Sequence, residues 1–148
     1  YIKTVGGNTT FNLNIPPMPN GKFNEKDVKR LKELGDKINA EFGKNLAKNA
    51  KITENKKSNS NQTEFVAELP EKVTVKYIDI AETISEGQKV ESFKIYIKDE
   101  NSLWKSLKSE TTIGSRKIVA LGGVTTDCIK VVITAARDAV KLDWIKVY

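Results

Sequence analysis

One stretch of the sequence, residues 9–42, restricts the fold more than any other, because its periodicity changes from that of a strand to that of a helix. Apolar residues alternate with asparagines over residues 11–15, which predicts a strand. Two consecutive prolines follow, and since proline cannot donate to a β-ladder, the strand must end there. An Asn-Gly pair then supplies a turn. Apolar side chains recur every three or four positions over residues 28–42, which predicts an amphipathic helix. The stretch is therefore predicted to be one βα unit.

The start of this helix carries several signals that favour helix initiation. Asn24 is a good N-cap, and Asp27 places a negative charge at the positive end of the helix dipole. Phe23 and Val28 have the spacing of a hydrophobic staple. Gly43 is the expected C-cap, and the alternative is a helix extended by one more turn through Leu46 and Ala47. We expect the apolar face of the helix to pack on an apolar surface; its members are Val28, Leu31, Leu34, Ile38 and Phe42.

From residue 65 onward the sequence has the pattern of strands. Short segments rich in β-branched and aromatic residues alternate with turn signals, at a spacing typical of an antiparallel sandwich. Residues 53–63, rich in Asn, Ser and Lys, separate this part from the helix and are predicted to be a polar linker. The expected strands are FVAEL, VTVKYIDI, VESFKIYIK, SLWKSLK, RKIVAL, CIKVVIT and LDWIKVY.

Composition excludes several classes of function. The 148 residues include no His, which excludes Ser-His and Cys-His catalysis and the usual zinc sites. The single cysteine, Cys128, lies in an apolar segment and is expected to be an ordinary buried thiol. The whole net charge of +6 falls in residues 1–57, without a nucleic-acid reader motif, so no nucleic-acid partner is expected. No apolar run approaches the roughly 18 residues of a membrane span. No cofactor and no metal site is expected.

Both halves of the chain resemble a known family. The sequence LNIPP at residues 13–17, followed by GKFNEKDVKRLKELGDKI at 21–38, resembles the last barrel strand and helix of family 29 glycoside hydrolases, the α-L-fucosidases. The second half resembles the jelly-roll, discoidin-like sandwich that often follows that barrel. The motifs that carry this second resemblance are EGQKVESF at 86–93, Trp104, TTIG at 111–114, Arg116, VTTD at 124–127 and Arg137.

The resemblance implies an α+β fragment: a terminal βα unit of a (β/α)8 barrel followed by an antiparallel β-sandwich. Residues 1–52 would be the last strand and helix of the barrel, 53–63 the linker and 64–148 the sandwich domain. The family pattern contains about thirty further residues between Ile52 and Phe65 that this sequence lacks.

The resemblance also implies a function, namely that of the C-terminal part of a bacterial α-L-fucosidase that hydrolyses terminal α-L-fucose with retention. The expected partners are fucosylated glycans and the remainder of the barrel, and the expected location is secreted, periplasmic or at the cell surface. The family's catalytic carboxylates lie upstream of the matched strand. No catalytic residue is therefore assigned, and the chain alone is expected to be inactive. The alternative is a non-catalytic carbohydrate-binding or adhesion sandwich with a helical spacer.

Three residues are candidates for contact with sugar. Asn14, at the end of the predicted strand, is a candidate substrate-binding residue, although it is more simply explained by hydrogen bonds to neighbouring loops. Trp104 is a candidate stacking platform or else half-buried packing. Arg137 is a candidate sugar contact or else ties a loop to a neighbouring strand. Trp144, between aliphatic residues, is expected in or near the core.

Overall fold

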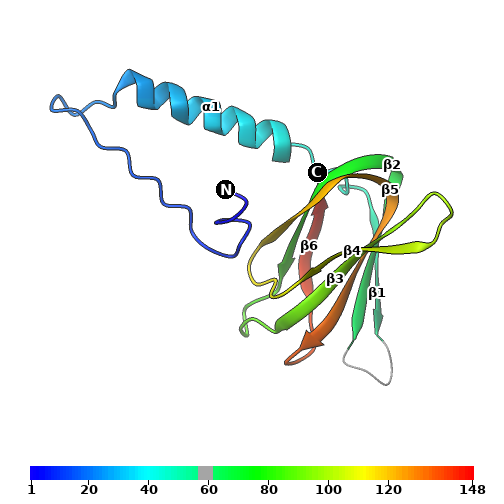
Figure 1. Ribbon diagram of the computed structural model, residues 1–148. Helices are drawn as coiled ribbons and strands as arrows, with labels where there is room; N and C mark the ends of the chain where they lie inside the picture. Colours follow the sequence, from blue (N-terminus) through cyan, green and yellow to red (C-terminus); the bar gives the residue numbers. More distant parts are fainter. Residues whose placement is uncertain (57–61) are drawn as a thin grey trace.

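The structure is a computed structural model that describes residues 1–56 and 62–148 (Figure 1). A loop and one helix precede an antiparallel β-structure. The described elements are α1 (Glu25–Phe42), β1 (Lys51–Lys56), β2 (Thr63–Glu82), β3 (Val90–Lys98), β4 (Trp104–Glu110), β5 (Lys117–Ala136) and β6 (Leu142–Val147).

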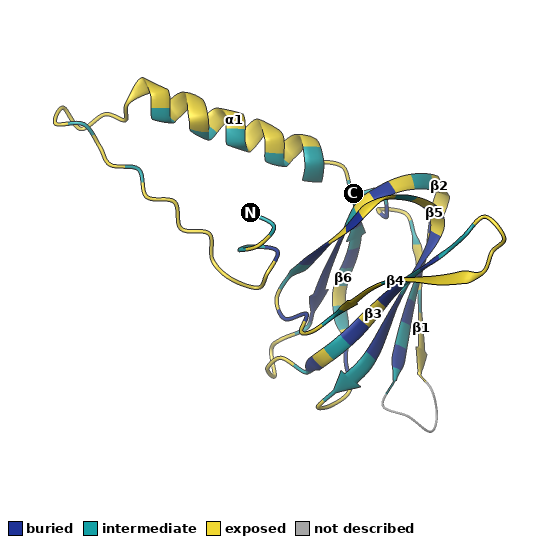
Figure 2. Cartoon of the chain, in the orientation of Figure 1, coloured by how far each residue is buried: buried dark blue, intermediate teal, exposed yellow. Residues whose placement is uncertain are grey.

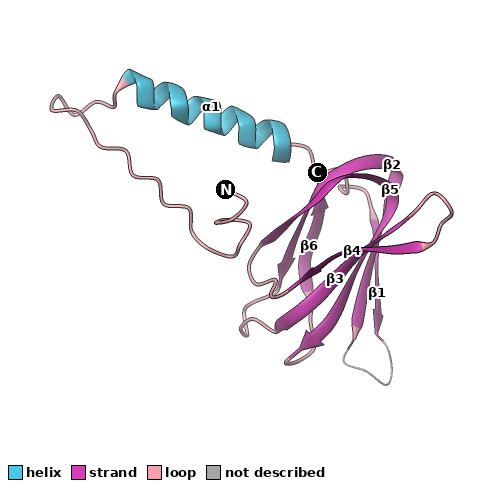
Figure 3. Cartoon of the chain, in the orientation of Figure 1, coloured by secondary structure: helices cyan, strands magenta, loops and turns pink. Residues whose placement is uncertain are grey.

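The strands pair in the order β1-β2-β5-β3-β4, and β6 pairs with β2. Strands β2 and β5 are each 20 residues long and pair along most of their length. The first part of β2 pairs with β1 and its last part pairs with β6. Figure 3 shows that β2 and β5 curve over at one end, so that the sheet folds back on itself. The result is a sandwich whose two layers share their longest strands.

The boundaries of the predicted strands are corrected at two places. FVAEL and VTVKYIDI are parts of one strand, β2, and RKIVAL and CIKVVIT are parts of β5. The Pro70 segment and the Gly122-Gly123 pair, which resemble turns in the sequence, do not reverse the chain. The register between β2 and β5 shifts between Glu68 and Val73, and both glycines have positive φ, at 80° and 79°. These positions therefore bend long strands instead of ending them.

The prediction of a polar linker is wrong for residues 53–56, because these residues lie in strand β1. Each residue of β1 pairs with a residue of β2, from Lys51 opposite Glu68 to Lys56 opposite Thr63. An exposed edge strand needs few apolar residues, because backbone hydrogen bonds to its neighbour hold it, and polar edges discourage aggregation. The rest of the predicted linker, residues 57–61, lies outside the described residues.

The core lies between the two layers and follows the alternation of the strands. In β3, Phe93, Ile95 and Ile97 are buried, whereas Lys94, Tyr96 and Lys98 point outward. Full burial of one such aliphatic or aromatic side chain contributes about 2 kcal/mol before entropy. Cys128 is buried as expected. Ala47, which precedes β1, already belongs to this core, so the sandwich begins before its first strand.

The predicted strand at residues 11–15 does not form. The segment runs as a loop, and Phe11 and Leu13 are 39% and 49% exposed (Figure 2). A strand requires a neighbour for its backbone groups, and the sandwich offers this stretch none in the described chain. The Asn-Gly turn is present, since Gly21 has a φ of 77° and its N–H donates to Met18 O.

Helix α1 forms as predicted, but it buries no residue. Asn24 is the N-cap and accepts a hydrogen bond from the Lys26 backbone N–H at 2.9 Å. Gly43 is the C-cap. The staple residues Phe23 and Val28 are about half exposed. At the other end of the helix, the Phe42 ring lies 5.0–5.4 Å from the rings of Tyr1, Tyr77 and Tyr148. The apolar face of α1 therefore packs only near the C-terminus of the helix. Among the described residues, no helix is long and apolar enough to cross a membrane.

Candidate functional site

The junction between the N-terminal segment and the sandwich is held by specific polar contacts. The Ile118 backbone N–H donates to Gly6 O at 2.8 Å. The Asn8 side-chain oxygen accepts from the backbone N–H and the hydroxyl of Ser115, at 2.9 and 2.6 Å. Gly114, at a φ of 67°, leaves the space for this side chain, because a Cβ there would clash with Asn8. The N-terminal segment is therefore attached to the start of β5.

A buried carboxylate lies beneath this junction. Asp79 of β2 is fully buried and accepts two hydrogen bonds from Arg116, at 2.7 and 3.0 Å, and one from the Trp144 indole at 3.1 Å. The guanidinium also lies 5.6 Å from the centre of the Tyr1 ring. Burial opposes the charge of Arg116, but the hydrogen bonds and charge of Asp79 outweigh it and raise the pKa of Arg116. Desolvation, with the charge of Asp79, likewise raises the pKa of Tyr148.

An apolar groove of about 470 Å³ lies where α1 meets the sandwich. Its walls include Leu34, Ile38 and Phe42 from the helix, Tyr1 from the N-terminus and Tyr77 from β2. Among the described residues, Glu41 is the only acidic residue that lines it. Glycoside hydrolysis requires two carboxyl groups on either side of the scissile bond, so this groove is suited to packing and not to that chemistry.

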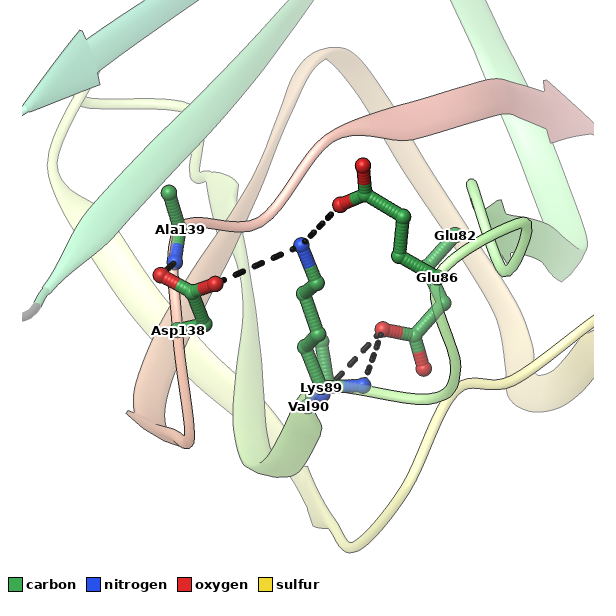
Figure 4. A network of polar contacts seen from close by, with 6 residues as sticks. All are labelled: Glu82, Glu86, Lys89, Val90, Asp138 and Ala139. Atoms are coloured by element: carbon green, nitrogen blue, oxygen red, sulfur yellow. Dashed lines mark hydrogen bonds and ion pairs between the residues drawn. The ribbon is translucent and has the colours of Figure 1, made fainter.

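A second polar network joins the end of β2 to the start of β3 (Figure 4). Glu82 is 1% exposed, and its carboxylate accepts hydrogen bonds from the backbone N–H groups of Lys89, Val90 and Gly114, at 3.1, 3.1 and 2.6 Å. This carboxylate holds two loops to one strand. Both of its oxygens accept backbone hydrogen bonds, so its role in this structure is to hold these loops.

The ammonium group of Lys89 lies between two exposed carboxylates in the same network. It is 3.1 Å from Glu86 and 3.6 Å from Asp138. The hydrogen bond to Glu86 is the main cause of the raised pKa of Lys89. The backbone N–H of Ala139, together with Lys89, lowers the pKa of Asp138. Within residues 1–56 and 62–148, no cluster of three or more potential metal ligands occurs.

The structure does not bring the three sequence candidates together. Asn14 is exposed in the N-terminal loop, with no side-chain hydrogen bond within the described part of the chain. Trp104 is 38% exposed at the start of β4. The Arg137 side chain is 75% exposed and pairs with Glu91 of β3 at 3.0 Å, which is the loop-to-strand contact given as its alternative role. Trp144 is half-buried beside Asp79.

Sequence reasoning missed the two buried carboxylates, although a signal for one was present. Ile78, Asp79 and Ile80 are all buried, so this part of β2 is covered on both faces. An acidic residue in such a doubly buried strand must have a partner, since an unpaired buried charge is strongly unfavourable. Its partner in the structure is Arg116, which stands out in the sequence only as one of the residues shared with the sandwich of the resembled family.

Comparison with known proteins gives the class of the chain. No family model matches it. It is 26% identical to Alpha-L-fucosidase 1 of Arabidopsis thaliana, over 100% of this chain and 35% of that protein. A GH29 fucosidase of Ruminococcus gnavus, solved with fucose, superposes with a TM-score of 0.86 at 24% identity, over 100% and 35% of the two chains. A family 32 carbohydrate-binding module from Streptococcus pneumoniae EndoD has a TM-score of 0.58 at 12% identity and covers 71% of this chain.

In fold and in sequence the chain, with its N-terminal loop and helix followed by a sandwich, is similar to the C-terminal part of glycoside hydrolases. More particularly, the chain resembles the C-terminal part of the family 29 α-L-fucosidases. It spans about a third of the length of these relatives. The alignment with the Arabidopsis protein extends over 175 positions, whereas the chain has 148 residues, so at least 27 positions have no counterpart here. This number agrees in size with the segment of about thirty residues that the sequence lacks.

Proposed function

We propose that the chain is the C-terminal part of a retaining α-L-fucosidase, in which the sandwich supports a catalytic barrel that acts on fucosylated glycans. The observation that carries the proposal is the match over the whole chain to an α-L-fucosidase. The proposal also includes a bacterial source and secretion or display at the cell surface.

The junction at Asp79 favours a supporting role. The contacts of Asn8 and Gly6 fix the N-terminal segment on the sandwich, while the apolar face of α1 remains only partly covered. An amphipathic helix with an exposed apolar face requires a partner surface. In the proposed enzyme that surface is the rest of the barrel, and the sandwich holds the helix in place for it.

The chain by itself should have no hydrolytic activity. In a (β/α)8 enzyme the catalytic groups come from the C-terminal ends of several strands, and the buried carboxylates here are occupied by structural hydrogen bonds. The test is release of the aryl group from an aryl α-L-fucoside, with an aryl β-D-galactoside as the control substrate. We expect the purified chain to equal the buffer blank and the product of the whole gene to cleave only the fucoside.

Two outcomes would contradict the proposal. One is turnover by the purified chain that disappears when one of its carboxylates is replaced. The other is a whole gene product that is folded but leaves the fucoside intact.

A carbohydrate-binding module is the second candidate function. It is favoured by the likeness of the sandwich to the family 32 module and by the exposed Trp104. A glycan array probed with the purified chain separates the two, because a supporting sandwich retains no glycan whereas a binding module does.

A further inference from the structure

The outer surface of strands β3, β4 and β5 carries a group of aromatic and basic side chains that neither the fold nor the junction uses. We call it the β3–β4 face, and its members are Lys94, Tyr96, Lys98, Trp104, Ser106 and Lys130. The cross-strand register places Lys98 opposite Trp104, and Tyr96 opposite both Ser106 and Lys130. The alternate residues of β3 are buried, so these side chains all point away from the core. Figure 1 shows the β3–β4 hairpin projecting away from α1.

Two ammonium groups converge on one exposed indole. The Lys130 Nζ lies 4.3 Å from the centre of the Trp104 ring and 5.3 Å from that of Tyr96. The Lys98 Nζ lies 5.5 Å from the Trp104 ring. Trp104 nevertheless remains 38% exposed. The Lys130 side chain is only 14% exposed, so the accessible groups at this point are the ring edge of Trp104 and the ammonium group of Lys98.

The positive charge of this face is only partly neutralised. Lys130 pairs with Glu64 at 3.7 Å. Lys94 and Lys98 form no ion pair in the part of the chain that the structure describes. Lys105 and Lys108 of β4 lie opposite the buried Ile97 and Ile95, so they belong to the other side of the sheet. Glu110, the acidic residue of β4, is 3.1 Å from Lys117 of β5. Glu68 and Asp127 line a pocket together with Lys98, but within the described residues neither forms an ion pair with it, so Lys94 and Lys98 are the uncompensated cations of this face.

Protection of the sheet edge explains some of these lysines but not the whole arrangement. Charged residues on an edge strand discourage pairing with another chain, which accounts for Lys105 and Lys108. It does not account for Trp104, since a large exposed aromatic residue on an edge favours association. An exposed ring beside uncompensated cations matches a ligand that is both carbohydrate-like and negatively charged.

We propose that the β3–β4 face binds an anionic saccharide, that is, a sugar chain bearing carboxylate or sulfate groups. An apolar face of a sugar ring packs against Trp104, and the anionic group binds Lys98, with Lys94 alongside. Lys130, which is mostly covered, supports the Trp104 ring from below. This site is separate from the groove at α1, and binding there does not require fucosidase activity.

The test is affinity electrophoresis of the purified chain in gels that contain heparin, polygalacturonate or neutral mannan, followed by titration with the anionic polymer that retards it. We expect retardation by an anionic polymer and none by mannan. Trp104→Ala should weaken binding about tenfold, which corresponds to one good ring contact. Ser106→Glu, which adds a negative charge but leaves Trp104 in place, should weaken it by a similar factor.

The matched control replaces one exposed lysine of α1, Lys29→Ala, which lowers the net charge by one, as Ser106→Glu does, but on another surface. It should change the affinity less than twofold. If the control lost as much affinity as the β3–β4 variants, binding would come from general attraction between a basic protein and an anionic polymer, and the proposal would be overturned. Retardation by mannan, unchanged binding in both β3–β4 variants, or no retardation by either anionic polymer would also overturn it. Melting curves of each variant verify that it is folded.

Discussion

The carboxylate of Glu82 is expected to contribute more to stability than any exposed charge of the chain. Its Oε2 accepts from two backbone N–H groups and its Oε1 from a third, that of Gly114 at 2.6 Å. Glutamine has one acceptor oxygen. In its better orientation Glu82→Gln keeps the two bonds to Lys89 and Val90 and turns its NH2 group toward Gly114 N–H, so that two donors face each other.

The size of the effect follows from this geometry. The substitution removes one charge-assisted hydrogen bond and leaves a buried backbone N–H unsatisfied, which together should lower the free energy of unfolding by about 2–4 kcal/mol. The assay is urea denaturation followed by far-UV circular dichroism, with the slope m compared between variants. Glu86→Gln is the matched control, because Glu86 lies in the same network but its side chain is 80% exposed.

The control should show no change beyond experimental error, as is usual for a solvent-exposed ion pair. If Glu82→Gln were as harmless as Glu86→Gln, the three short contacts would not be stabilising, and the account of this loop junction would be refuted. A changed slope m would point instead to an altered denatured state.

Two further predictions concern the helix and the pH dependence of stability. Phe42→Ala removes contacts with three tyrosine rings and should lower the free energy of unfolding by about 2–3 kcal/mol. Val28→Ala, at a half-exposed position, should change it by less than about 0.5 kcal/mol. Equal effects of the two substitutions in urea denaturation would contradict the packing described. The pKa of Asp138 is lowered in the folded chain by the Ala139 N–H and by Lys89, so its contribution is present above its ordinary value of 3.8 and is lost as the pH falls through the folded pKa. Asp138→Asn should therefore be less stable than the parent at pH 7 and equal to it near pH 2, and a difference that persists at low pH would contradict this assignment.

The parts of the fold that could be predicted from sequence are those fixed by local pattern. The helix boundaries follow from Asn24 and Gly43, and the inward alternation of β3 follows from its period of two. The strand at 11–15 has the same period, yet it does not form, because pairing depends on a neighbour that local sequence does not specify. Long strands such as β2 were divided at Pro70, since a bulge and a turn use similar residues.

The candidate site shows the same limit. Exposure of Trp104 and the contact between Arg137 and Glu91 were among the alternatives that sequence offered. The convergence of Lys98 and Lys130 on Trp104 was not, because these residues come from three different strands and their proximity depends on the register between them. The roles assigned to Asn14, Trp104 and Arg137 remain predictions.

The structure also places the start of the sandwich earlier than the predicted linker. The Asn45 side-chain oxygen accepts hydrogen bonds from Val147 N–H and Ala47 N–H, each at 3.0 Å, and Leu46 N–H donates to Val147 O at 2.8 Å. Strand β1 then pairs along β2. The unit that can fold alone should therefore begin near Asn45 and not at residue 64.

Two shortened chains test this boundary. A chain of residues 45–148 loses α1, which buries no residue, the Phe42 and Tyr1 ring contacts, and the hydrogen bonds of Gly6 and Asn8 to the start of β5. It should remain folded with a loss of about 2–4 kcal/mol. A chain of residues 63–148 also loses β1 and the Asn45 contacts, which uncovers the edge of β2 and the Phe65 side of the core. Because an uncovered edge next to an incomplete core favours association, this chain should unfold or aggregate. Both are compared with the parent by circular dichroism and size-exclusion chromatography. An unfolded 45–148 would mean that the sandwich depends on the N-terminal segment, and a 63–148 as stable as 45–148 would mean that β1 is not an integral strand.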